Sequence, residues 1–201
     1  MTGVQTCALP ISFSDVYEQY YYFEGHKLTV VPEFCAIEFE DPQLPNAPNI
    51  MYEKTENAVN EWKEKLIQRT GNEAGWNFSF IKISQEEFEN LFSKNTCDIA
   101  IFFQPEPITE EEKQLAGHTF AGFGVADITI FYLEPIFSPT GKTFEFEGEI
   151  YEWMEVTSYK NNIDPMVSDT IKHEIGHALG LDHYPSSPEE FIEIRPQTFV
   201  S

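Results

Sequence analysis

The order of apolar and polar positions divides the chain into short strands and amphipathic helices. Residues 26–40 are rich in β-branched and aromatic side chains, which predicts a strand. Pro32 inside it indicates an edge, a bulge or a late start. Residues 51–70 repeat apolar side chains at helical spacing, which predicts a long amphipathic helix closed by Gly71. The apolar positions of that helix are Ala58, Val59, Trp62, Leu66 and Ile67.

Four further strands and a short helix follow from the same patterns. Residues 76–83 alternate between apolar and polar side chains and predict a strand, and residues 85–92 predict a short helix. Residues 97–103 predict a central, buried strand. Residues 117–124 and 126–133 predict an edge strand followed by an inner strand, because the first is punctuated by glycines and the second is strongly β-forming.

Residues 134–164 form an inserted segment in which aromatic and acidic side chains alternate, which predicts a hairpin about Gly148. We expect the glutamates to form a solvated face. A calcium site is the alternative, although no calcium-binding motif supports it. The alternating residues are Phe144, Phe146, Ile150, Tyr151 and Trp153 against Glu145, Glu147, Glu149 and Glu152.

The composition narrows the class of protein. The 201 residues carry 34 acidic and 12 basic side chains, a formal net charge of −22, which argues against nucleic-acid binding and adhesion to anionic membranes. No uncharged apolar stretch approaches the length of a membrane span. With 18 Phe, 9 Tyr and 3 Trp, the chain has enough apolar area for a packed core.

The first eleven residues need separate treatment. Residues 1–11 resemble the in-frame translation of a sequencing-library adapter rather than a signal peptide, because they lack a basic start and a long apolar run. We therefore expect residues 12–201 to form a single domain whose native N-terminus is missing. Excluding Cys7 leaves Cys35 and Cys97, for which one disulfide and two buried thiols are both open alternatives.

The last predicted helix carries the candidate chemistry. Asp164 and Pro165, or Ser168, are expected to cap its start. Its apolar stripe consists of Ile171, Ile175, Ala178 and Leu179. Residues 173–183 read HEIGHALGLDH, which fits the pattern HExxHxxGxxH.

Helical geometry explains the spacing of the histidines. His173 and His177 lie about 40° apart around a helix and about 6 Å apart along it, so both imidazoles can reach one cation. His183 would lie about 15 Å along a continued helix, on another face. The helix must therefore end for His183 to become a third ligand, and Gly180 allows that because glycine tolerates positive φ.

Three imidazole nitrogens suit Zn²⁺ and leave a fourth position for water, as in catalytic zinc sites. Such an ion lowers the pKa of bound water and polarises a carbonyl group. Glu174 lies too close to His173 to act as a further ligand without strain. It is expected to be the general base that accepts the proton of the attacking water and delivers it to the leaving amine.

This eleven-residue pattern resembles that of the metzincin clan of zinc metallopeptidases, and ADITIFYL, CDIAIFF and HEIGHALGLDH are most similar to matrixins, including bacterial and archaeal ones. The resemblance implies an α+β fold: a twisted mixed sheet of about five strands with a long helix and an active-site helix. It implies zinc ligation by His173, His177 and His183, with Glu174 as catalytic acid/base. It also implies an extended peptide along the edge strand, residues 117–122.

The sequence departs from the clan's pattern after the third histidine. No Met lies between His183 and Ser201, so the Met-turn that metzincins place beneath the zinc is missing, and we expect truncation rather than divergence. Tyr184 does not match the residue that marks the familiar families. A cysteine switch and a second histidine cluster are also absent from the sequence. Archaemetzincins are disfavoured because their cysteines after the third histidine are lacking.

The sequence therefore predicts a secreted zinc metalloendopeptidase that cleaves internal peptide bonds of proteins. The alternative is a catalytically silent metzincin-like module that binds zinc or another protein. A third hypothesis is an acidic interaction protein in which the motif is fortuitous. His118, on the predicted edge strand, is expected to be a surface residue rather than a metal ligand.

Overall fold

The structure is a computed structural model. The residues that it describes are 23–24, 27–28, 32–70, 78–92, 97–109, 112–122, 125–146 and 148–179.

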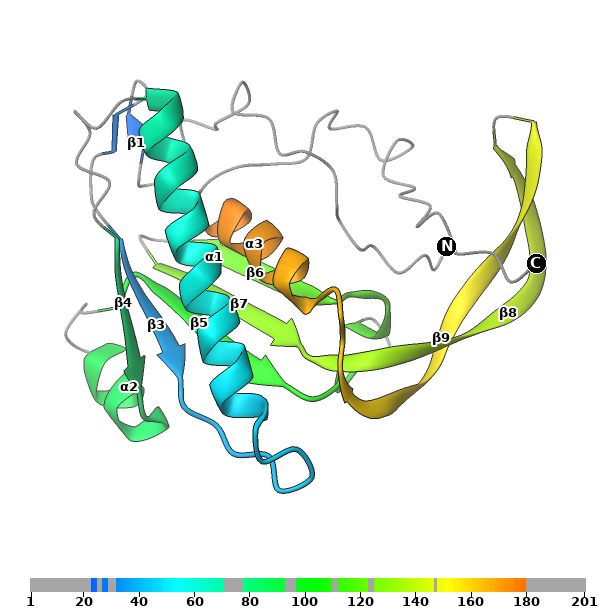
Figure 1. The fold of residues 1–201 in the computed structure, drawn as a ribbon, viewed down its shortest axis with the longest axis horizontal. Coiled ribbons are helices and arrows are strands. Elements are labelled where there is room, and N and C mark those ends of the chain that lie inside the picture. Colours follow the sequence, from blue (N-terminus) through cyan, green and yellow to red (C-terminus); the bar gives the residue numbers. More distant parts are fainter. Residues whose placement is uncertain are drawn as a thin grey trace.

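A five-stranded mixed sheet forms the centre of the molecule, in the order β4-β3-β5-β7-β6 (Figure 1). Neighbouring strands from β4 to β7 run parallel, and β6 pairs antiparallel with β7 at one edge. The strands are β3 (Glu33–Ile37), β4 (Ser79–Ile83), β5 (Ile99–Gln104), β6 (Gly117–Gly122) and β7 (Val125–Phe131). A separate pair of short strands is β1 (Phe23–Glu24) with β2 (Lys27–Leu28).

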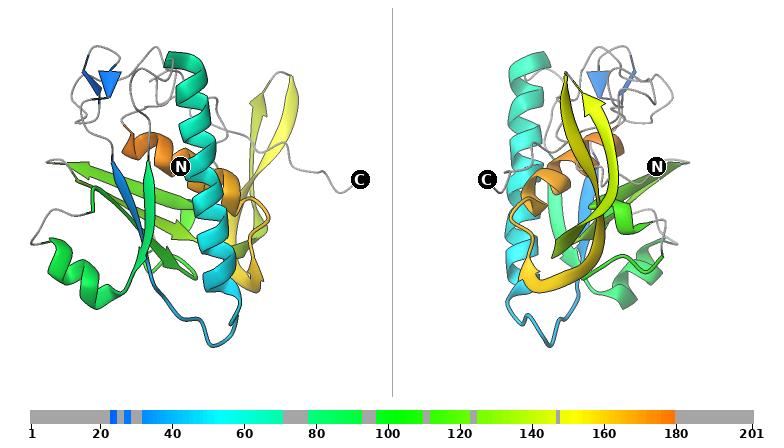
Figure 2. Two further views of the ribbon diagram at one scale, coloured as in Figure 1. Left: turned by 60° about the vertical axis from the view of Figure 1, so that its left-hand side comes forward. Right: turned by 90° about the vertical axis from the view of Figure 1, so that its right-hand side faces the viewer.

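Helices cover both faces of this sheet. The long helix α1 (Ala47–Thr70) and the last helix α3 (Val167–Ala178) lie on one face (Figures 1 and 2). The short helix α2 (Gln85–Phe92) packs on the other face, where the Phe88 ring contacts Phe102 edge-on at 5.3 Å. A 3-10 turn, η3 (Glu112–Gln114), precedes β6. The described part of the chain contains no helix long and apolar enough to cross a membrane.

The main core lies between the sheet and the pair α1 and α3. Alternate residues of β5 and β7 point into it, among them Ile101 and Ile128, which are fully buried. The expected apolar stripe of α1 is confirmed, since Ala58, Val59 and Leu66 are at most 2% exposed. Burial of these two surfaces against each other is the main apolar contribution to folding.

The predicted elements are confirmed, although several of their ends differ. The strand expected over 26–40 is β3, which begins directly after Pro32 and ends at Ile37, whereas Lys27–Leu28 pairs separately as β2. The strands expected over 97–103 and 126–133 differ from β5 and β7 by one or two residues at each end. The helix expected from Met51 begins at Ala47 instead. Pro48 lies in its first turn, where a residue without an N–H group loses no intrahelical hydrogen bond. The edge position of β6 and the inner position of β7 are as predicted.

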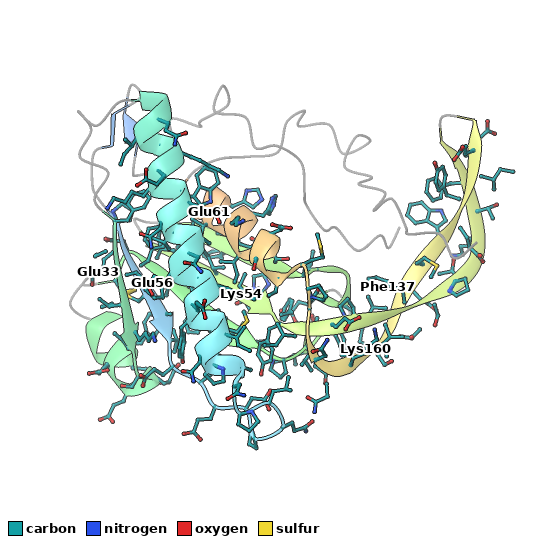
Figure 3. All side chains as sticks on the ribbon, viewed as in Figure 1. Glu33, Lys54, Glu56, Glu61, Phe137 and Lys160 are labelled. Atoms are coloured by element: carbon teal, nitrogen blue, oxygen red, sulfur yellow. A yellow bond between two sulfur atoms is a disulfide. The ribbon has the colours of Figure 1, made fainter. Side chains whose placement is uncertain are left out.

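Residues 133–163 form the predicted hairpin, which projects away from the sheet (Figure 2). Its strands are β8 (Leu133–Phe146) and β9 (Glu149–Ile163), and Gly148 at the turn has φ +83°. Near the turn the Phe144 ring lies 4.6 Å from that of Trp153. Nearer the base, Lys160 forms an ion pair with Glu134 on the facing strand (Figure 3 labels Lys160). The hairpin joins the end of β7 to the start of α3, so its base helps to place the last helix.

A disulfide bond joins Cys35 in β3 to Cys97 just before β5, with 5.9 Å between the two Cα atoms. It lies beneath α2, next to Ile37 and Ile83. Of the two alternatives left open by the sequence, the structure contains the disulfide.

Replacing both Cys35 and Cys97 by alanine is expected to lower the free energy of unfolding by about 4 kcal/mol, since the bond closes a loop with a sequence separation of 62. Urea denaturation measures the change, with Cys7→Ala as the control that leaves the pair intact. Non-reducing peptide mapping should recover Cys35 and Cys97 in one linked pair of peptides. Recovery of two free thiols there would contradict the assignment.

Candidate metal centre

The last helix is fixed between α1 and the sheet by polar contacts as well as apolar ones. The indole Nε1 of Trp62 donates a hydrogen bond of 2.7 Å to the carbonyl oxygen of Lys172. Lys172 forms an ion pair with Glu61 at 2.9 Å, and the ammonium group of Lys54 donates to Ser168 Oγ at 2.8 Å (Figure 3 labels Lys54 and Glu61). These contacts join α1 to both the first and the middle turn of α3, so they fix its rotation.

The start of α3 differs in detail from the sequence prediction. The N-cap residue is Met166, whose side chain makes no capping hydrogen bond. Asp164 stabilises the preceding turn, because its Oδ1 accepts from the Met166 N–H at 2.9 Å. Ser168 is not the cap, since it lies inside the helix and bonds to Lys54. The helix ends at Ala178 with Leu179 as C-cap, and the predicted helix-ending residue Gly180 lies outside the described residues.

The two histidines on α3 converge as their spacing predicts. The Nε2 atoms of His173 and His177 are 2.7 Å apart, and the rings are nearly perpendicular. His173 is only 6% exposed. Two nitrogens bound tetrahedrally to one Zn²⁺ at 2.0–2.1 Å would be about 3.3 Å apart. The pair therefore fits such an ion after opening by roughly half an ångström.

The third predicted ligand, His183, lies outside the described residues, so its position is not part of this geometry. Within the described ranges, no three side chains of His, Cys, Asp or Glu gather closely enough to hold a metal ion. Within the described residues, the candidate metal ligands are therefore two imidazole nitrogens on one face of α3. The calcium site was only the alternative to a solvated face for the hairpin glutamates, and nothing in the described residues supports it.

Glu174 is buried between α3 and the edge strand β6. It is 6% exposed, and its Oε2 lies 2.6 Å from Thr119 Oγ1. Burial raises the pKa of the Glu174 carboxyl, because it disfavours the charged form. The Thr119 hydrogen bond and the nearby His177 and His118 rings act in the opposite direction on this pKa but do not cancel the effect of burial.

Gly117 makes this close approach of Glu174 to β6 sterically feasible. A Cβ atom at position 117 would lie 2.9 Å from the Thr129 carbonyl oxygen and 3.2 Å from Glu174 Cγ. The first distance is shorter than ordinary van der Waals contact and involves backbone, which cannot easily move aside. Gly117 and Thr119 share one face of β6, because side chains alternate along a strand, and this face carries α3.

His118 lies on the opposite side of β6 from Thr119 and Gly117. It is half-buried rather than a plain surface residue, and its ring lies 5.9 Å from that of Phe131. Its Nδ1 is buried and has no hydrogen-bond partner among the described residues. The described structure does not bring it to the histidine pair on α3.

Sequence reasoning missed Thr119 and Gly117 as residues of the site. The alternation of residues 117–122 could have placed both on one face of the edge strand. Nothing in the sequence pairs that face with Glu174, which lies 55 residues further along the chain from Thr119.

We expect the protein to bind one Zn²⁺ per chain, and His177→Ala to weaken binding by more than about tenfold, since losing even a residue that only hydrogen-bonds to a metal ligand costs about 10- to 100-fold. Competition with a chromogenic chelator measures the affinity, and elemental analysis gives the stoichiometry. His118→Ala is the matched control and should bind as the wild type does. Wild-type affinity in His177→Ala would exclude the pair as ligands.

Gly117→Ala is expected to destabilise the fold by about 1–3 kcal/mol, because the added methyl group overpacks the contact between β6 and α3. Thermal or urea unfolding measures the loss. Phe120→Ala, on the same strand but at a side chain that is 73% exposed, should change stability by less than about 0.5 kcal/mol. If Gly117→Ala is as stable as the wild type, β6 and α3 are packed less closely than the distances at Gly117 indicate.

Comparison with models of known protein families and with curated proteins gives no match for this chain.

Proposed function

We propose that the protein is a zinc-dependent metalloendopeptidase that hydrolyses internal peptide bonds of proteins. The observation that carries this proposal is the convergence of His173 and His177 beside a buried glutamate at the edge of the sheet. The two Nε2 atoms, 2.7 Å apart and within hydrogen-bond distance of each other, lie where one ion could bind both. The carboxyl group of Glu174 is buried next to them.

His173, His177 and His183 would hold the ion. When bound, Zn²⁺ would activate water and polarise the carbonyl group of the scissile bond. Glu174 accepts the proton of the attacking water and returns it to the leaving nitrogen, so the C–N bond breaks as a neutral amine forms.

The edge strand β6 offers a place for an extended substrate. Among the described strands β6 pairs only with β7, so its other edge has backbone groups available for a peptide strand. Thr119 in this strand contacts Glu174 directly. A peptide added to β6 would therefore run past the general base, with Phe120, 73% exposed, beside its alternate side chains.

A place in the metzincin clan, close to the matrixins, is part of this proposal. Its support is the mixed sheet with one antiparallel edge strand, the long helix α1, and the motif on α3. The Cys35–Cys97 disulfide supports secretion, since such bonds persist in oxidising compartments.

Glu174→Gln should retain zinc and lower kcat/KM at least about 100-fold, because the amide cannot act as a base. Cleavage of fluorogenic casein by the zinc-loaded chain, with and without a chelator, measures activity. Glu56→Gln, an exposed position on α1, is the control and should keep full activity (Figure 3 labels Glu56).

Two outcomes contradict the proposal in different ways. Full activity in Glu174→Gln would remove Glu174 from the role of general base. A wild-type chain that holds one zinc but cleaves nothing would instead indicate the catalytically silent binding module.

A further inference from the structure

We propose that Thr119 is a positioning residue that holds the Glu174 carboxyl in one place against the edge strand. The inference rests on the proposed function, because it assigns Thr119 a part in the work of the general base. Thr119 belongs to the edge strand, whereas the motif that identifies Glu174 lies on α3.

The hydroxyl of Thr119 lies within hydrogen-bond distance of two oxygens of the same residue. Its Oγ1 is 2.6 Å from Oε2 of Glu174 and 3.0 Å from the backbone carbonyl oxygen of Glu174. A hydroxyl group has one hydrogen to donate and two lone pairs with which to accept. It can therefore serve only one of these two oxygens as donor at a time.

The shorter of the two contacts is the one to the carboxyl group. Donation from the Thr119 hydroxyl to Oε2 at 2.6 Å ties that oxygen to β6, so the proton of the attacking water would go to the other carboxyl oxygen, Oε1. The carbonyl oxygen of Glu174 at 3.0 Å lies close to the same hydroxyl, which keeps Thr119 next to the backbone of α3.

Other residue types at position 119 would not do this. Valine has the same shape as threonine but can neither donate nor accept. With Glu174 only 6% exposed, bulk water offers little replacement for the lost partner.

Placement matters here because small errors in the position of a catalytic group reduce rates strongly. Gly117 leaves space for the Glu174 side chain on the same face of β6, and Thr119 fixes where the carboxyl group lies in that space. The strand proposed to hold the substrate thereby also positions the general base.

The test compares Thr119→Val and Thr119→Ser in the zinc-loaded full chain, with a fluorogenic peptide as substrate. Thr119→Val should lower kcat about 10- to 100-fold, the effect of losing a hydrogen bond to a charged group, with KM within about twofold. Thr119→Ser, which keeps the hydroxyl, should stay within about threefold of wild-type kcat. Thr143→Val, an exposed strand position on the hairpin, is the matched control and should be unchanged.

A second readout does not depend on turnover. Crystal structures of the metal-free wild type and Thr119→Ser should show the Glu174 side chain in one conformer, and Thr119→Val should show it displaced or in several. An unchanged Glu174 in Thr119→Val overturns the inference, and so does wild-type kcat in that variant. A Thr119→Ser variant with a kcat as low as that of Thr119→Val also overturns the inference about Thr119. A wild-type chain without any activity contradicts the proposed function instead, and leaves the crystal structures as the test of Thr119.

Discussion

The packing of α3 between α1 and the edge of the sheet is the contact on which the rest of the site depends. Ile171 and Ile175 are fully buried on one side of this twelve-residue helix. Each residue step turns a helix by about 100°, so their burial also decides where His173, Glu174 and His177 point. A rotation of one residue would remove Glu174 from Thr119.

The same packing places the carboxyl group of Glu174 in a buried environment. The chain is strongly acidic, and among the described residues Asp164 and Glu174 are the acidic side chains that are buried. Burying a carboxyl group costs free energy unless it is hydrogen-bonded. Thr119 supplies that bond, and the nearby His177 and His118 rings favour the charged form.

Much of the fold could be predicted because its elements follow local rules. Period-two alternation identified β4, β-forming side chains identified β7, helical spacing identified α1 and α3, and Gly148 identified the hairpin turn. The sequence prediction began α1 at Met51 instead of Ala47, because a proline in the first turn of a helix does not stand out as part of the apolar repeat. Local rules explain the convergence of His173 and His177 as well, since both lie on one helix.

What could not be predicted depends on contacts between distant parts of the chain. The partnership of Thr119 with Glu174 and the clearance at Gly117 require knowing that β6 lies against α3. The Cys35–Cys97 bond depends on the order of β3 and β5 in the sheet, which cysteine spacing does not encode. The position of His183 depends on a turn after α3. Its role as the third ligand is a prediction from the sequence alone.

The most direct measurement is X-ray absorption at the zinc edge of the zinc-loaded wild type and His183→Ala. We expect three imidazole nitrogens and one oxygen at about 2.0–2.1 Å in the wild type. His183→Ala should retain only two imidazoles around the ion. A zinc environment that includes sulfur, or one that is the same in both proteins, would contradict the three-histidine centre.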